Sequence, residues 1–325
     1  MKRWLLLSLL VPALNGQAAE QGASEWLERM STAFRESSYQ GVLIFGNDRQ
    51  WQTLSVTHAL IDDVEYEKIR HLTGVPREII RRGNGTTCLN PSEHNVRPDA
   101  QLPVPLMGYS ANTDAGAVYD FQMQNVSRIA GRYAQHIRVA PRDDYRYGYN
   151  LWLDQESGLL LRSELVGPQQ QILERFQFAD INIGASLSES DFALQGDCRS
   201  HAKADQQGDG STDNTVVNWL PEWVPDGFRL ASASQIPTPA AVGEKEHSPI
   251  RLMYTDGLAS FTVFVDATDA EPMPEIVSQW GATSAAVRYL NHDKLRYRIT
   301  AVGELPSDAI VRIAGSVAYH VVDGK

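Results

Sequence analysis

The feature that most constrains this chain is a run of short segments in which apolar and polar residues alternate. Gly, Asn and Pro residues separate these segments from one another. Alternation with a period of two places every second side chain on the same face of a β-strand, and Gly, Asn and Pro favour tight reversals. The pattern therefore predicts successive antiparallel strands over residues 39–45, 51–60, 64–72, 77–82 and 86–89.

A second block with the same pattern runs from residue 119 to residue 183. Few helical segments interrupt either block, which argues against parallel βαβ winding. We expect an α+β fold whose main part is a large curled antiparallel sheet or half-open barrel. Before the strands, residues 25–37 carry Trp26, Met30 and Ala33 on one helical stripe, with Ser24 as a candidate N-cap. This helix is expected to pack on the concave face of the sheet.

The composition turns polar between residues 199 and 215, which indicates a linker between two domains. The larger domain then spans residues 20–198 and the smaller one residues 216–325. The smaller domain contains further strand patterns and, after Pro306, an apolar helical stripe formed by Ile310, Ile313, Ala314 and Val317. A small antiparallel sheet that carries one helix is expected there.

The N-terminus has the pattern of a cleavable secretory signal over residues 1–19. Lys2 and Arg3 precede a short apolar run, and the small residues Ala18 and Ala19 follow it. No later segment approaches the roughly 20 consecutive apolar residues that a membrane-spanning helix needs. We therefore expect an exported protein of the bacterial periplasm. The net charge of −11 argues against nucleic acid as a partner.

Catalytic patterns are missing from the sequence. The eight His residues are scattered, and neither a nucleophile elbow nor a metal-binding His pair occurs. We expect no enzyme activity, no cofactor and no metal, and we interpret His58 and His136 as hydrogen-bonded structural residues. Cys88 and Cys198 are the two cysteines of the chain, and in an oxidising compartment they form either one disulfide or two buried thiols.

Three groups of residues are candidates for binding, and each has a structural alternative. The first is an apolar, Pro-containing segment that is either a ligand-contacting lid or a packed loop. The second is a set of strand arginines that suit phosphate oxygens but also suit cross-strand ion pairs. The third is a pair of tryptophans that either anchor the small domain's core or contact a partner. These candidates are, in that order, Leu102, Leu106, Met107 and Tyr109; Arg77, Arg81 and Arg82; and Trp219 and Trp223.

Several segments together resemble the RseB/MucB family, in their order and spacing, and are most similar to its MucB branch. No single segment is diagnostic, but the resemblance covers nearly the whole chain after the signal. The segments are residues 39–45, 76–84, 131–139, 152–157, 219–225, 254–258 and 302–306.

The resemblance implies a periplasmic negative regulator of an envelope-stress sigma factor. Such a regulator binds the periplasmic part of a membrane-spanning anti-sigma factor and shields it from site-1 proteolysis. In the family, the large domain is similar to lipoprotein carriers of the LolA/LolB type and senses lipopolysaccharide or lipid A, whose binding releases the anti-sigma factor. The MucB branch also regulates alginate production. The small domain is then expected to bind the anti-sigma factor; a lipid or lipoprotein carrier is the alternative, and the sequence leaves open whether the chain forms a homo-oligomer.

Overall fold

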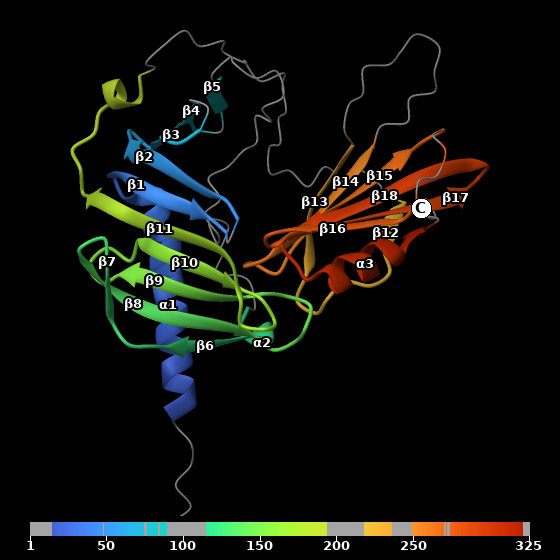
Figure 1. The fold of residues 1–325 in the computed structure, drawn as a ribbon, viewed down its shortest axis with the longest axis horizontal. Coiled ribbons are helices and arrows are strands. Elements are labelled where there is room, and N and C mark those ends of the chain that lie inside the picture. Colours follow the sequence, from blue (N-terminus) through green and yellow to red (C-terminus); the bar gives the residue numbers. More distant parts are fainter. Residues whose placement is uncertain are drawn as a thin grey trace, which may run out of the picture.

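The computed structural model describes residues 15–47, 49–74, 77–83, 85–89, 115–193, 218–235, 249–269, 271 and 274–320. Two β-rich units lie side by side (Figure 1). The N-terminal unit, within residues 15–193, is built on an 11-stranded sheet, and the C-terminal unit, within residues 218–320, on a six-stranded sheet. In the described part of the chain, no helix is long and apolar enough to cross a membrane.

All strand pairs of the N-terminal sheet are antiparallel. Along the sheet the order is β5-β4-β3-β2-β1-β11-β10-β9-β8-β6, and β7 pairs with β8. Over the described residues this order has two ends, β5 and β6, so the sheet is open, which confirms the predicted fold class. The strands are β1 Tyr39–Gly46, β2 Trp51–Ile61, β3 Val64–His71, β4 Glu78–Arg82, β5 Gly85–Leu89, β6 Tyr119–Met123, β7 Ser127–Ile129, β8 Arg132–Pro141, β9 Gly148–Asp154, β10 Leu160–Val166 and β11 Ile172–Ile183.

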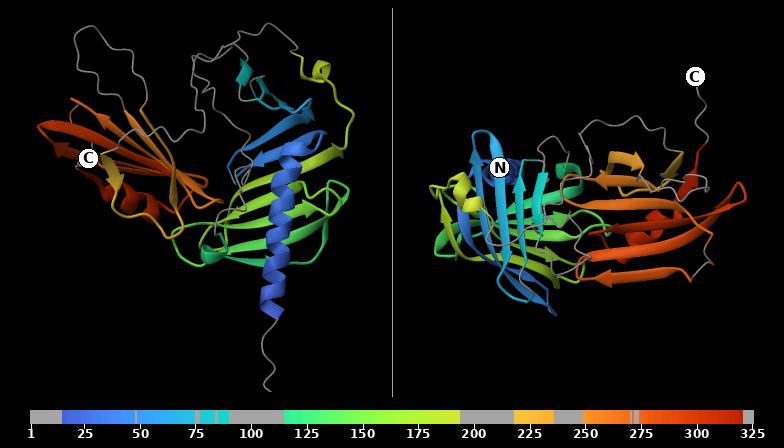
Figure 2. Two further views of the ribbon diagram at one scale, coloured as in Figure 1. Left: turned by 180° about the vertical axis from the view of Figure 1, so that it is seen from behind. Right: turned by 90° about the horizontal axis from the view of Figure 1, so that it is seen from above.

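The sheet curls around helix α1, Asn15–Glu36, which crosses one of its faces (Figure 2, left). The helix contacts both β6, at one end of the strand order, and β2, well toward the other end. Leu27, Met30 and Phe34 are almost fully buried and share one core with Leu43 and Phe178 of the sheet. The predicted packing of this helix on the sheet is confirmed.

The helix begins earlier than we expected, so Ser24 lies inside α1 and the prediction that it is the N-cap is wrong. The preceding residues, Gln17, Ala18, Ala19 and Glu20, all favour a helix, and the helical turns continue through them. Two short helical elements complete the N-terminal unit: α2, Ala115–Val118, and η1, Glu189–Phe192.

The C-terminal sheet is also antiparallel throughout, with the order β13-β14-β15-β18-β17-β16. Helix α3, Ser307–Gly315, covers one face and buries Ile310 and Ile313 against it. Val317, expected on the helix, instead starts a strand that pairs with the first strand of the unit. The strands are β12 Trp219–Pro221, β13 Arg229–Gln235, β14 Ile250–Thr255, β15 Ser260–Ala267, β16 Ile276–Trp280, β17 Thr283–His292, β18 Leu295–Gly303 and β19 Val317–Tyr319.

Candidate functional site

Several predicted site residues cannot be placed. Leu102, Leu106, Met107 and Tyr109 lie outside the described residues, as do the linker over residues 199–215 and Cys198. The side chain of Cys88 is likewise outside the description. The lid and the disulfide therefore stay predictions.

Among the candidate arginines Arg77, Arg81 and Arg82, the last two each lie close to a carboxylate. Arg81 on β4 pairs with Glu67 on the adjacent strand β3, and the Glu67 side chain is only 6% exposed. Burial raises the pKa of Glu67, and the charge of Arg81 offsets part of that rise. Arg82 is exposed and lies 3.4 Å from Glu189 of η1. Arg77 precedes β4, where its carbonyl oxygen accepts a hydrogen bond from the amide of His71. A phosphate-binding role for these arginines stays a prediction.

Both predicted partner-binding tryptophans pack against other residues of the chain. Trp219 is 4% exposed, and its ring lies 4.6 Å from that of Tyr297 in the core of the C-terminal unit. Trp223 packs under the guanidinium of Arg312 at 3.8 Å and edge-to-face with Tyr145 of the N-terminal unit at 5.0 Å. Trp219 thus occupies the core position that was its structural alternative, and Trp223 lies at the junction of the two units.

The same junction contains a buried ion pair. Arg146, just before β9, and Asp256, in the β14–β15 turn, approach to 2.9 Å, and neither side chain is exposed. Tyr119 of β6 donates its hydroxyl hydrogen to the same Asp256 oxygen at 3.0 Å, and Arg146 also donates to the carbonyl oxygen of Asp226 at 2.6 Å. The second Asp256 oxygen accepts hydrogen bonds from two backbone amides of its own turn, those of Leu258 and Ala259. Both charges are therefore compensated within the protein.

A close backbone contact adjoins this ion pair. Gly227 has a φ of +85°, and a Cβ at this position would lie 3.1 Å from Val118 of α2. Glycine is the residue that adopts this conformation without strain. The turn before β13 can therefore pack directly on the N-terminal unit.

The other part of the junction is acidic. Glu174 of β11 accepts a hydrogen bond from the amide of Ala282 at 3.2 Å, in the β16–β17 turn. Gln279 of β16 donates to the hydroxyl of Tyr147 at 3.2 Å. Burial raises the pKa of Glu174, and burial together with the charge of Glu174 raises the pKa of Glu304, after β18, to about 7. The sequence carried no signal for these contacts, because they join segments more than 100 residues apart.

Among the strands of the described residues, β16 is paired on one side only, and its other edge is apolar and free. It ends the strand order of the C-terminal sheet, and Ile276, Val277 and Trp280 are 43%, 54% and 65% exposed. A free edge strand leaves backbone groups available to another extended chain. We did not predict this strand from the sequence, although three apolar residues followed by Gly281 were a usable signal.

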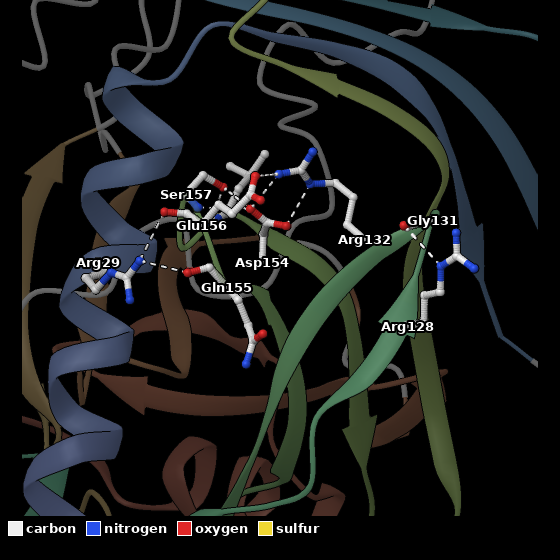
Figure 3. A network of polar contacts seen from close by, with 9 residues as sticks. Arg29, Arg128, Gly131, Arg132, Asp154, Gln155, Glu156 and Ser157 are labelled. Carbon is white, nitrogen blue, oxygen red and sulfur yellow. Dashed lines mark hydrogen bonds and ion pairs between the residues drawn. The ribbon is translucent and has the colours of Figure 1, made fainter.

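A polar network joins α1 to the N-terminal sheet (Figure 3). Arg132 of β8 forms two hydrogen bonds to Asp154, at 2.7 and 3.1 Å, and Ser157 donates to the same carboxylate. Burial raises the pKa of Asp154, but the hydrogen bonds from Arg132 and Ser157 outweigh burial, so the net pKa is lowered. Arg29 of α1 donates to the carbonyl oxygens of Gln155 and Glu156, each at 3.3 Å.

The two histidines singled out in the sequence have structural contacts. His58 is buried between the carbonyl oxygen of Ser37, at 2.8 Å, and Glu65, at 3.1 Å. His136 stacks on Trp152 with ring centroids 4.4 Å apart. The described residues contain no group of three or more His, Cys, Asp or Glu that could hold a metal ion.

Two family models match the chain in sequence order. The MucB/RseB N-terminal domain matches residues 22–195, and the MucB/RseB C-terminal domain matches residues 213–318. The chain belongs to the MucB/RseB family. The predicted resemblance is thereby confirmed.

Relatives in this family match over almost their full length. "Sigma factor AlgU regulatory protein MucB" of Pseudomonas aeruginosa is 33% identical, with 96% of this chain and 95% of the relative covered. "Sigma-E factor regulatory protein RseB" of Escherichia coli is 28% identical, with 97% and 98% covered. A solved complex of Pseudomonas aeruginosa MucA/MucB is similar to this chain with a TM-score of 0.75 and 30% identity, over 93% of this chain and 100% of that one.

Proposed function

We propose that this chain is a periplasmic negative regulator of an envelope-stress sigma factor, and that it acts by binding the periplasmic segment of an anti-sigma factor. The observation that carries the proposal is membership of the MucB/RseB family across both units. A relative that is named a sigma factor regulatory protein supports it, as does a solved structure titled as MucB in complex with MucA(peri). Protection from site-1 proteolysis, release by lipopolysaccharide or lipid A, and an output in alginate production are parts of the proposal that follow from the family resemblance.

The two units have different roles in this proposal. After a signal peptide over residues 1–19, the domain over residues 20–198 senses lipid and the domain over residues 216–325 binds the anti-sigma factor, with residues 199–215 as linker. The curled sheet around α1 suits the first role, because its buried face is apolar. Acyl chains would have to displace Leu27, Met30 or Phe34, or enter beside them.

We place the anti-sigma segment at the edge of β16. An extended peptide that pairs with a free edge strand gains main-chain hydrogen bonds, and its alternate side chains gain specificity from apolar neighbours. Ile276, Val277 and Trp280 supply such neighbours, and Trp280 is the most exposed of them. In this arrangement Trp280 is the apolar anchor, while Trp219 supports the core.

The experiment is a calorimetric titration of the mature protein with the periplasmic anti-sigma segment, which measures the dissociation constant. Replacing Trp280 with Ala should weaken binding about tenfold or more, because anchor residues of this type contribute about 2 kcal/mol or more. Tyr133→Ala in the N-terminal unit is the matched control, since Tyr133 is 69% exposed. If the Trp280 variant bound with full affinity, the proposed site at β16 would be excluded. If the unmodified protein did not bind the segment, the proposed function would be refuted.

A lipid or lipoprotein carrier is the second candidate, and the curled open sheet favours it. A carrier has no need of a second unit that is attached through a buried ion pair, so Arg146 and Asp256 favour the regulator. Transfer of acylated lipid between vesicle populations separates the two candidates, because a regulator should bind lipid without speeding its transfer. We propose no turnover of substrate by either function.

A further inference from the structure

His58 of β2 joins the end of helix α1 to the neighbouring strand β3. Its Nδ1 atom lies 2.8 Å from the carbonyl oxygen of Ser37, the residue that follows the last residue of the helix. Its Nε2 atom lies 3.1 Å from Oε1 of Glu65. The His58 side chain is only 1% exposed, so these two partners, and not water, satisfy the ring.

The chemistry of the two partners determines how many protons the ring carries. A carbonyl oxygen can only accept a hydrogen bond, and so can an ionised carboxylate. Both ring nitrogens must therefore carry a hydrogen, which is the charged imidazolium form of histidine. A neutral imidazole has a single N–H group and could donate to only one of the two partners.

Glu65 has the ionised form that this argument requires. The hydrogen bond from His58 is the largest cause of a lowered pKa of Glu65; burial opposes it, and the positive charges of His58, Arg81 and Arg35 add to the lowering. The Glu65 side chain is 48% exposed, so water also solvates the carboxylate. The proton between the two groups therefore belongs to the imidazole.

The other surroundings of His58 also suit a positive charge. The Ser37 carbonyl lies at the C-terminal end of a helix, where the helix dipole favours a cation. Burial raises the pKa of Tyr39, whose ring stacks on the imidazole at 4.9 Å, so the phenol stays neutral. The titratable and charged groups that face His58 or Glu65 from the described elements are Tyr39 of β1, Glu67 of β3 with its partner Arg81 of β4, and Arg35 of α1.

We propose that His58 is a proton-dependent link between α1 and β3. In the charged form, the ring donates to both partners and holds the C-terminal end of the helix on the sheet. In the neutral form, the ring keeps only one of the two bonds. Whichever bond it keeps, the end of α1 loses the adjacent positive charge, and its last turn opens more readily.

The direction of the effect follows from proton linkage. His58 binds its second proton more tightly when the end of α1 is docked, because the docked arrangement supplies an acceptor for each N–H group. The link is therefore lost as the pH rises, and histidine exchanges this proton between about pH 5 and pH 8. On the acid side, Glu65 must stay ionised, so the link is also lost as the pH falls below 4.5 through the lowered pKa of Glu65.

The link bears on the proposed sensing of lipid, and this step rests on the proposed function. Acyl chains that enter the apolar face must displace Leu27, Met30 or Phe34 of α1, or pass beside them. A helix that is held at its C-terminal end resists this displacement, so lipid should bind more tightly as the pH rises through the transition. Titrations with lipid A micelles at both ends of the transition test this step. Equal affinities would refute it, whereas no binding at either end would refute the sensing role and leave the link intact.

The link itself can be tested on the mature protein without any ligand. NMR of the ring nitrogens of His58, assigned through its own Cβ, counts its N–H groups from about pH 5 to about pH 9. Hydrogen exchange of the Ser37 amide, corrected for the pH dependence of free amides, reports the last turn of α1, because this amide donates to the Ala33 carbonyl oxygen. We expect two N–H groups at the acid end and one at the alkaline end. Protection of Ser37 should fall about tenfold with the same midpoint.

Two variants make the test decisive. Glu65→Gln supplies an amide that can donate to the neutral ring, so both bonds survive loss of the proton and the midpoint should move to lower pH by about one unit or more. The exposed position of Glu65 allows this variant to fold. Glu28→Gln, at an exposed position of α1, is the control and should leave the midpoint unchanged. The proposal is overturned if His58 shows no change in its N–H groups, if Ser37 keeps its protection when it does, or if Glu65→Gln keeps the original midpoint.

Discussion

Arg146 and Asp256 form an ion pair with 2.9 Å between Nη1 and Oδ2, although 110 residues separate them in the sequence. Both side chains are fully buried, and each makes further hydrogen bonds, to the Asp226 carbonyl oxygen and the Tyr119 hydroxyl. Removing two charges from water is costly, and only good geometry with complete hydrogen bonding offsets that cost. The pair therefore restricts the orientation of the two units at this end of the junction.

Neutralising one partner should be strongly destabilising. Asp256→Asn removes the fully buried counter-charge of Arg146 and leaves the partly exposed Asp143, at 3.1 Å, as its remaining carboxylate partner, so we expect the free energy of unfolding to fall by up to about 3–5 kcal/mol. Urea denaturation followed by fluorescence measures the change. Asp293→Asn is the control, because the Asp293 side chain is 86% exposed, and it should cost less than about 1 kcal/mol. A small loss for Asp256→Asn would show that Asp143 or water compensates the charge of Arg146.

The two kinds of tryptophan should respond differently to truncation. Trp219→Ala removes a buried indole from contacts with Tyr297 and Tyr319, and should cost about 3–5 kcal/mol of stability. Trp280→Ala removes an exposed side chain and should cost less than about 1 kcal/mol. Thermal or chemical unfolding of both variants gives the comparison. Equal losses would contradict the separation of core and surface roles.

Asp154 should make stability dependent on acid. Its pKa in the folded state is lowered, so the ionised form contributes stability above pH 3.8 that is lost as the pH falls through the folded value. Asp154→Asn should therefore be less stable than the unmodified protein at pH 7. The difference in their free energies of unfolding should become smaller below about pH 4. Urea titrations at pH 7, 4.5 and 3 test this. Gln155→Ala, in the same turn, is the control, because a side chain that cannot ionise should change stability equally at all three pH values.

The apolar segment around residues 102–109 should act in lipid binding. Each buried CH₂ of an acyl chain contributes about 0.8 kcal/mol, so a charge placed in its path is costly. Leu106→Asp or Met107→Asp should weaken binding of lipid A more than binding of the anti-sigma segment. Parallel titrations with lipid A micelles and with the segment measure both affinities. An equal loss of both, or of neither, would place the acyl chains elsewhere.

Local pattern was enough to predict most elements of the fold. The two-residue alternation in β2 and the helical stripe of α1 report which face is buried, and both signals are contained within about ten residues of sequence. Strand β16 was missed because its apolar residues lie on an exposed edge and lack clear alternation. The prediction of Ser24 as the N-cap was wrong because a helix begins where its first stable turn forms. A single favourable capping residue does not determine that position.

By itself, the amino-acid sequence determined the antiparallel strands, the helix that packs on them, the absence of a recognisable catalytic motif and the family resemblance. These depend on residue types and short spacings, which are local properties. The tertiary structure alone decided that Trp219 is buried while Trp280 is exposed, and that Glu174 of one unit accepts a hydrogen bond from Ala282 of the other. Burial and the pKa of a carboxyl depend on which distant segments exclude water from it, and contacts between segments more than 100 residues apart set that environment.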